Sequence, residues 1–228
     1  METEKIEKRI KTKFKNKDLL RQALVHRSYL NENRDFELDH NERLEFLGDA
    51  VLELATTEFL YNNFSNPEGE LTNFRAALVN SNMLAKIANE LGLEDFLLMS
   101  KGEKKDTGKA RQYILANSLE AIIGAIYLDQ GFRKAKKFIA DNFLCRMEDV
   151  LQKKLYRDAK SQFQEQAQEI VGVTPCYKVM KEWGPDHDKH FVIAIYLGEE
   201  KVAEGEGTSK QAAQMKAAEA GLKAKDWN

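Results

Sequence analysis

The chain has 228 residues, enough for one large domain or two smaller ones with separate cores. Hydrophobic residues make up 43% and charged residues 32%, which is typical of a globular protein and excludes a disordered one. The longest apolar run, 114–128, is too short and too mixed to cross a bilayer, and the first residues lack the apolar centre of a signal peptide. We therefore expect a cytoplasmic protein with no membrane segment.

Cysteines and histidines give no sign of a metal site. Cys145 and Cys176 have no partner at C-x-x-C spacing, so we expect each to be a small buried apolar residue. The four histidines include no pair at metal-ligand spacing, so any metal ion would be held by oxygen. The net charge of −2 argues against a strongly basic nucleic-acid binder, but basic residues are grouped at 101–111 and 153–160.

The first part of the chain, residues 4–150, predicts an all-α domain. Apolar residues recur mostly at helical spacing, for example over 19–30, and alternating β-branched runs are few. A turn at 65–70 precedes a single predicted helix over 71–91, which Gly92 ends. The segment 101–109, rich in lysine and glycine, predicts a surface loop.

The pattern changes after residue 150. A predicted amphipathic helix over 158–172 is followed by three predicted strands, 176–184, 190–198 and 201–207, and by an alanine-rich helix over 209–225. The order α-β-β-β-α can bury one face of a sheet under two helices and fold alone. We expect domains at 4–150 and 155–226, with a linker near 148–157. The alternative is that the leucines of this segment extend the preceding helix.

Two acidic stretches interrupt this otherwise ordinary pattern. In NERLEFLGDAVL, residues 41–52, a helix would place Glu42, Glu45 and Asp49 on one face. The opposite face would be apolar and would carry Leu44, Leu47, Val51 and Leu54. In the second stretch, 114–128, Asn117 and Glu120 share a face and Glu120 has only apolar neighbours.

Buried carboxylates of this kind need a partner. Burying one without a counter-charge costs several kcal/mol or shifts its pKa until it is neutral. A Mg²⁺ ion would resolve the problem because it prefers oxygen ligands and is commonly shared between carboxylates and substrate phosphate. The residues therefore indicate Mg²⁺-dependent hydrolysis of a phosphate ester. The alternative is a plain solvated face, the usual place for acids on helices.

The same stretches resemble a known family. HNERLEFLGDAVL is similar to the signature of bacterial ribonuclease III, and LVHRSYL, PEGELTNFRAALV and ILANSLEAIIGAIYLD extend the match. In the second half, FQEQAQ, GPDHDKHF and GEGTSKQAAQMKAAEAGL resemble, in order, a double-stranded RNA-binding domain. The two resemblances cover nearly the whole chain.

This resemblance implies an all-α endonuclease domain followed by a small α+β domain that binds double-stranded RNA. It implies a homodimer that cleaves duplex RNA with Mg²⁺, for which Mn²⁺ can substitute, and leaves 5′-phosphate and 3′-hydroxyl ends. The family's substrates are ribosomal RNA precursors and structured messenger RNAs. No small-molecule cofactor and no membrane partner are implied.

The resemblance also assigns roles to single residues. Asp49 and Glu120 match the catalytic residues, and the metal ligands match Glu45, Asn117 and Glu120. Glu42 and Glu68 match further acids that assist. Asn117 stands where the family usually has an aspartate, and it supplies an oxygen without a charge.

Two interpretations of Asn117 stay open. Either the site tolerates a less negative ligand set, which we favour, or the chain is a catalytically impaired protein that only binds duplex RNA. A third hypothesis, a Mg²⁺-dependent hydrolase of small phosphate esters, leaves the second domain unexplained.

The second domain offers candidate RNA contacts. Duplex RNA is recognised mainly by shape, through its shallow minor groove and its phosphates. One helix face would supply minor-groove contacts through Gln164, Glu165 and Gln168, and the resemblance gives His187 a second such contact. The last helix begins with Ser209, Lys210 and Gln211, where its dipole favours phosphate. Each of these candidate residues has an alternative interpretation as ordinary solvated surface. For Ser209 the alternative is that it serves only as a helix N-cap.

Overall fold

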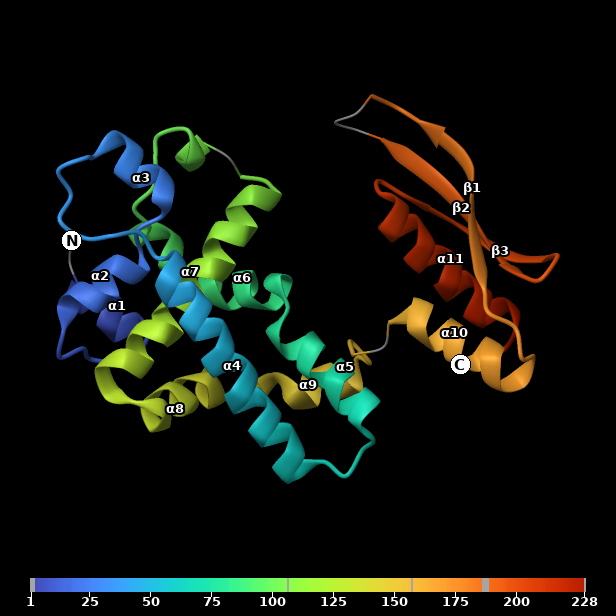
Figure 1. Ribbon diagram of the computed structural model, residues 1–228, viewed down its shortest axis with the longest axis horizontal. Helices are drawn as coiled ribbons and strands as arrows, with labels where there is room; N and C mark the ends of the chain where they lie inside the picture. The colour runs from blue at the N-terminus through green and yellow to red at the C-terminus, as the bar shows by residue number, and fades with distance from the viewer. Residues whose placement is uncertain (1–2, 106, 157, 186–188, 228) are drawn as a thin grey trace. The chain divides into compact units, whose positions relative to one another are not determined.

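The computed structural model describes residues 3–105, 107–156, 158–185 and 189–227. The chain divides into two compact units, Met1–Tyr156 and Arg157–Asn228. The first is helical, and the second has the element order α-β-β-β-α (Figure 1). The predicted fold class, an all-α domain followed by a small α+β domain, is confirmed.

The first unit is built from helices of six to 22 residues. Short 3₁₀ turns occupy Leu93–Phe96, Glu103–Lys105 and Leu144–Arg146. The α-helices are α1 Thr3–Arg9, α2 Lys17–Ala23, α3 Arg27–Glu32, α4 Glu42–Asn63, α5 Glu68–Val79, α6 Ser81–Glu90, α7 Lys109–Gln130, α8 Phe132–Asn142 and α9 Met147–Gln152.

Helices α4 and α7 cross at the centre of this unit, as Figure 1 shows. Two glycines let their backbones touch. A Cβ added to Gly48 would lie 1.8 Å from the carbonyl oxygen of Glu120, and one added to Gly124 would lie 2.2 Å from that of Leu44. Because α7 is apolar on most sides, it is buried along most of its length. The crossing therefore fixes α4 directly against the buried central helix.

The single helix predicted over 71–91 is wrong. The structure has two helices, α5 and α6, which meet at Asn80 in extended conformation (φ −71°, ψ 159°). The Asn80 side chain accepts a hydrogen bond from the Met83 amide at 2.9 Å and donates to the Ala76 carbonyl at 3.0 Å. One residue thus ends one helix and caps the next. Gly92 does follow α6 in left-handed conformation, as predicted (φ 63°).

The apolar face predicted for α4 is partly wrong. Leu44 and Val51 are buried and Leu47 is half-buried, but Leu54 is 58% exposed. Gly48 lies on the buried side, so the face against the core is rotated away from Leu54. Phe46 and Tyr61, on the exposed side, have 82% and 78% of their surface accessible. The helix therefore carries apolar residues on both sides.

Both cysteines are exposed, so the prediction that they are buried is also wrong. Cys145 lies in a 3₁₀ turn, where its Sγ donates to the Asp141 carbonyl at 3.3 Å. Cys176 begins strand β1 at the edge of the sheet. Neither residue is at a position that faces a core.

The second unit packs a three-stranded antiparallel sheet against two helices. The elements are α10 Ala159–Ile170, β1 Cys176–Trp183, β2 His190–Leu197, β3 Glu200–Gly207 and α11 Lys210–Ala224, with strand order β1-β2-β3. Phe163 of α10 is fully buried and its ring lies 5.1 Å from that of Trp227. Gly205 lets α11 approach β3, because a Cβ there would lie 2.2 Å from the Ala217 nitrogen.

A helix needs about 20 mostly apolar residues to cross a bilayer. No helix within the described ranges is both long enough and apolar enough to do so.

Candidate active site

The crossing of α4 and α7 brings the predicted acids together. Glu45 and Asp49 lie on α4 on either side of Gly48, and Glu120 lies on α7 at the point that Gly48 contacts. Burial raises the pKa of Glu120 to about 8 from its ordinary 4.5, and the charges of Asp49, Glu45 and Glu53 contribute to the rise in that order. The acids from two separate stretches therefore face one another.

Asn117 belongs to the same cluster. Burial raises the pKa of Glu45, and the charge of Glu42 adds to this effect. A hydrogen bond with the Asn117 side chain acts in the opposite direction. Because a carboxylate can only accept, the Asn117 amide nitrogen donates this bond. Its carbonyl oxygen is left to face another partner.

Three acids of this cluster have no cation beside them among the described residues. Across the parts of the chain that the structure describes, Glu45, Asp49 and Glu120 form no ion pair within 4.0 Å. Nor do any three His, Cys, Asp or Glu side chains in those parts form a group tight enough to hold a metal ion alone. Like charges held together with oxygen donors nonetheless fit a hard divalent cation, which fills its remaining positions with water and substrate oxygen.

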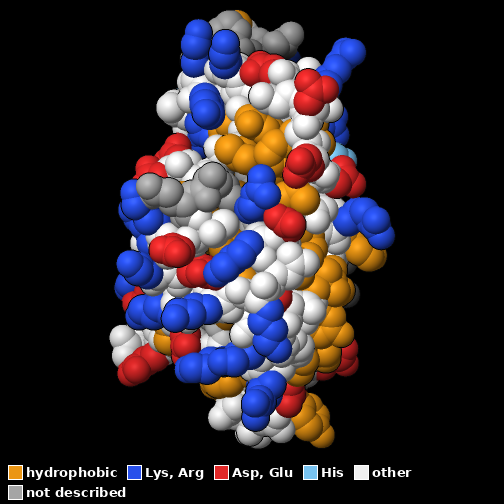
Figure 2. Space-filling view, turned by 90° about the vertical axis from the view of Figure 1, so that its left-hand side faces the viewer, with side chains coloured by type: hydrophobic (Ala, Val, Ile, Leu, Met, Phe, Trp, Pro, Cys, Tyr) orange, Lys and Arg blue, Asp and Glu red, His pale blue; other side chains and the backbone are white. Residues whose placement is uncertain are grey.

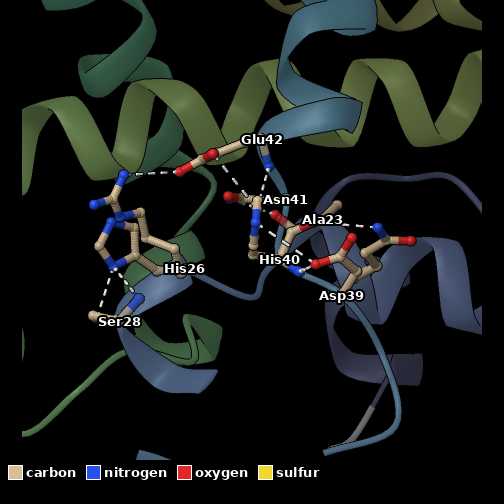
Figure 3. Close-up of polar contacts among 9 residues, drawn as sticks. Ala23, His26, Ser28, Asp39, His40, Asn41 and Glu42 are labelled. Carbon is tan, nitrogen blue, oxygen red and sulfur yellow. Dashed lines mark hydrogen bonds and ion pairs between the residues drawn. The ribbon is translucent and has the colours of Figure 1, made fainter. Parts of the chain in front are cut away.

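Glu42 differs from Glu45, Asp49 and Glu120 because it has basic neighbours. Arg27 Nη1 lies 3.5 Å from one of its carboxylate oxygens, and His40 Nδ1 lies 3.8 Å from the other. Figure 3 shows these contacts near His26, whose Nδ1 lies 2.8 Å from Ser28 Oγ. The start of α4 is thus fixed by polar contacts with the segment around α3.

Asn41, the N-cap residue of α4, is 2% exposed although it is polar. Its side-chain nitrogen donates to the Ala23 carbonyl at 3.3 Å (Figure 3) and to Ser118 Oγ at 3.4 Å. These bonds link the start of α4 to α2 and to the middle of α7. They hold the residues on both sides of the candidate site at a fixed spacing.

Glu53 is a member of the cluster that sequence reasoning missed. Its charge contributes to the raised pKa of Glu120, and it pairs with Arg75 at 2.8 Å. The spacing of Glu45, Asp49 and Glu53, each four residues apart on one helix, was a signal that could have found it. Glu68, by contrast, lies apart at the start of α5, beside Tyr61 and Arg75.

The minor-groove candidates on α10 share an exposed face. Gln164, Glu165 and Gln168 are exposed and line one shallow cleft, while Phe163 and Ala167 on the other side are buried. The predicted amphipathic helix is therefore present. His187 lies outside the described residues.

The residues at the start of α11 are also accessible. Ser209 is the N-cap, and its Oγ accepts a hydrogen bond from the Ala212 amide at 3.1 Å. Lys210 Nζ lies 5.6 Å from the centre of the Phe191 ring, and Gln211 is exposed. The N-cap interpretation of Ser209 is correct, and this role leaves the neighbouring amides free to face a phosphate.

Comparisons with known proteins agree with these two units. Residues 16–147 match the family model described as Ribonuclease-III-like, and residues 159–225 match the double-stranded RNA binding motif. A Ribonuclease 3 of Borreliella burgdorferi is 44% identical over 92% of this chain and 86% of its own length. A Ribonuclease 3 of Campylobacter jejuni is 44% identical over 96% of each.

A solved structure of a ribonuclease III nuclease domain matches the first unit. The nuclease domain of ribonuclease III from Campylobacter jejuni is 48% identical and superposes with a TM-score of 0.55, covering 62% of this chain and 98% of that one. These comparisons do not support the hypothesis of an impaired protein that only binds RNA. The chain belongs to the ribonuclease III family and is an endoribonuclease of double-stranded RNA, with a helical nuclease unit followed by a unit that binds the duplex.

Proposed function

We propose that the acid cluster between α4 and α7 is the catalytic centre for cleavage of duplex RNA. Asp49 and Glu120 are the catalytic residues, and Glu45, Asn117 and Glu120 hold Mg²⁺ or, in its place, Mn²⁺. The observation that carries this proposal is the crossing at Gly48, which brings Glu120 of α7 against the part of α4 that holds Glu45 and Asp49. The pKa of Glu120, raised to about 8 by burial and by these carboxylates, supports it. Glu42 and Glu68 have supporting roles.

Glu120 and Asp49 have different roles in this proposed mechanism. Glu120 must lose its proton before it can act as a ligand, so metal binding and deprotonation are coupled at this carboxylate. Asp49 is exposed, one turn beyond Glu45, and its carboxylate is placed to accept a proton from an attacking water. Mg²⁺, when bound, would stabilise negative charge on the phosphate during hydrolysis to 5′-phosphate and 3′-hydroxyl ends.

Asn117 fits the same centre as a neutral ligand. Its nitrogen donates to Glu45, which orients the amide and leaves its oxygen for the metal ion. The ligand set carries one negative charge less than it would with aspartate. We therefore infer a weaker affinity for Mg²⁺ but an intact geometry.

An apolar surface on α4 supports a homodimer. Phe46, Leu54 and Tyr61 are exposed by 82%, 58% and 78%, and Leu128 of α7 by 54%. Figure 2 shows hydrophobic side chains gathered along one edge of that view. Phe46 and Leu128 border a common cleft with Leu47, into which a partner's side chain can insert. The solved Campylobacter jejuni structure is described as having a region involved in dimer formation.

Substrates and context follow from the family. We propose structured ribosomal RNA precursors and messenger RNAs as substrates, in the cytoplasm, with no small-molecule cofactor. Domain bounds of 4–150 and 155–226 are part of this proposal, supported by the division of the chain at Tyr156. Helix α9, Met147–Gln152, continues two residues past the first bound.

The metal site can be tested apart from RNA binding. Mn²⁺ binding measured by electron paramagnetic resonance should be lost in Glu120→Gln and retained in Glu37→Gln, whose exposed glutamate carries the same charge elsewhere on this unit. Single-turnover cleavage should be abolished only in the first variant. Equal Mn²⁺ affinity in both variants would contradict the assignment.

A further inference from the structure

Helices α1 and α8 border a basic cleft on the nuclease unit, away from the acid cluster. The cleft has a volume of about 440 Å³ and lies between the segment that follows α1, the end of α7 and the length of α8. Its lining includes five cations and one acid: Arg9, Lys11, Lys13, Lys134, Lys137 and Asp141. This local excess of positive charge contrasts with the net charge of −2 on the whole chain.

Three of the five cations are available to a ligand. Arg9 pairs with Asp95 at 3.5 Å, and Lys137 pairs with Asp141 at 3.0 Å. Lys11, Lys13 and Lys134 are exposed and form no ion pair within 4.0 Å in the part of the chain that the structure describes. Figure 2 faces the side of Figure 1 that carries α1 and α8 and shows Lys and Arg side chains gathered over its lower half.

The backbone beside these lysines is held in place. Gln130 Nε2 donates to the Lys13 carbonyl at 2.8 Å. The amides of Lys15 and Asn16 donate to the Asp129 carboxylate at 2.9 Å and 2.8 Å. The segment is therefore fixed to the end of α7, so the cleft exists before any ligand arrives, which lowers the entropy cost of binding.

Lys11 has a backbone conformation that favours glycine. Its φ is 51°, in the left-handed region, where the Thr12 amide closes α1 by donating to the Glu7 carbonyl at 3.0 Å. Glycine is the usual residue at this position of a helix end, because a side chain there is strained. Lys154 has the same φ, so what distinguishes Lys11 is its position in the lining of the basic cleft.

We propose that this cleft binds phosphate groups of the RNA substrate, at a site separate from the centre that cuts it. Lysines are point charges suited to phosphate, and duplex RNA is the polyanion on which this enzyme acts. Gln130 at the cleft lies ten residues beyond Glu120 on α7, which is about 15 Å along a helix. A membrane is a poorer match, because the apolar lining residues Ile10 and Phe138 are 3% and 4% exposed and the third, Leu91, is half-buried.

The test uses the whole chain, a chelator to prevent cleavage, and a labelled RNA duplex of about 40 base pairs, longer than the roughly 16 that one double-stranded RNA-binding domain spans. The triple variant Lys11→Ala, Lys13→Ala, Lys134→Ala is compared with Lys11→Arg, Lys13→Arg, Lys134→Arg. The control keeps a positive charge at the same three exposed positions.

We expect the first triple variant to lose affinity on the order of tenfold. Its binding should also depend less on salt, with the log–log slope reduced by about 0.9 for each phosphate that is no longer neutralised. Equal affinity and slope in the two triple variants would overturn the proposal. A second outcome would also overturn it: the wild type binds phosphatidylglycerol vesicles, the first triple variant does not, and the two bind RNA with the same affinity.

A single substitution separates binding from folding. Lys11→Gly relieves the left-handed strain, so we expect a higher melting temperature together with weaker RNA binding. A variant that is more stable and binds RNA as tightly as wild type would show that Lys11 has no part in the site.

Discussion

Substitution of Gly48 by alanine tests whether the contact between α4 and α7 sets the geometry of the active site. The new Cβ would lie 1.8 Å from the Glu120 carbonyl oxygen, 2.6 Å from its carbonyl carbon and 2.9 Å from the Gly124 nitrogen. A Cβ essentially never lies closer than 3.0 Å to such atoms, so the backbones must separate by the difference of 1.2 Å. All three are backbone atoms, so no side-chain rotation relieves the overlap.

The size of the effect follows from this displacement. Overpacking a well-packed core costs about 1–3 kcal/mol, and a backbone clash belongs at the upper end. At about 2–4 °C per kcal/mol for a chain of this length, a cost of about 3 kcal/mol lowers the melting temperature by roughly 6–12 °C. Because the separation moves Glu120 away from Glu45 and Asp49, cleavage should slow by about 100-fold.

Thermal unfolding and single-turnover cleavage of duplex RNA measure both effects. Gly69→Ala is the control, because a Cβ there meets nothing within 4 Å and the residue lies in α5. Replacing glycine by alanine in a helix should stabilise the control by about 0.5–1 kcal/mol. If Gly48→Ala unfolds and cleaves as Gly69→Ala does, the close crossing does not position the site.

Three further predictions address the acid cluster, the dimer and the RNA contacts. Between pH 4.5 and about 8 folded Glu120 keeps a proton that the unfolded chain releases, so the metal-free protein should lose stability as pH rises through this window. The free energy of unfolding, measured with urea in chelator, should fall with pH in wild type and not in Glu120→Gln. Parallel pH profiles for the two proteins would contradict the prediction. Phe46→Asp should convert a dimer to a monomer in analytical ultracentrifugation, because it places a charge in the apolar surface of α4, while Val171→Asp, at a residue 50% exposed in the second unit, should not. Lys210→Ala should weaken duplex RNA binding and lower its salt slope by about 0.9, with the cleavage rate at saturating RNA unchanged. An unaltered slope would remove Lys210 from the interface.

Local patterns in the sequence predicted most of the fold. Helical spacing, glycine stops and the alternation of the strands are properties of neighbouring residues, so the order α-β-β-β-α and the all-α first domain were accessible without a structure. The break at Asn80 was missed because apolar spacing continues across it. A capping residue between two helices was the available signal, since Asn is a preferred N-cap.

Features that depend on how helices meet were less accessible. Spacing placed Glu45 and Asp49 on one face, but it could not show that Glu120 faces them or that Glu53 joins the cluster. Leu54 has the spacing of a core residue but is 58% exposed, because spacing shows only that a helix face is apolar. Periodicity identifies the apolar sides of a helix but does not show what packs against them.

The central claim is that this acid cluster cuts duplex RNA with a divalent metal ion. The most direct measurement incubates the whole chain with duplex RNA and with single-stranded RNA of the same sequence, each in Mg²⁺ and in chelator, and identifies the new ends. We expect cleavage of the duplex alone, only in Mg²⁺, leaving 5′-phosphates, and none by Glu120→Gln. Cleavage of the duplex in chelator, or by Glu120→Gln at the wild-type rate, would contradict the assignment of the site.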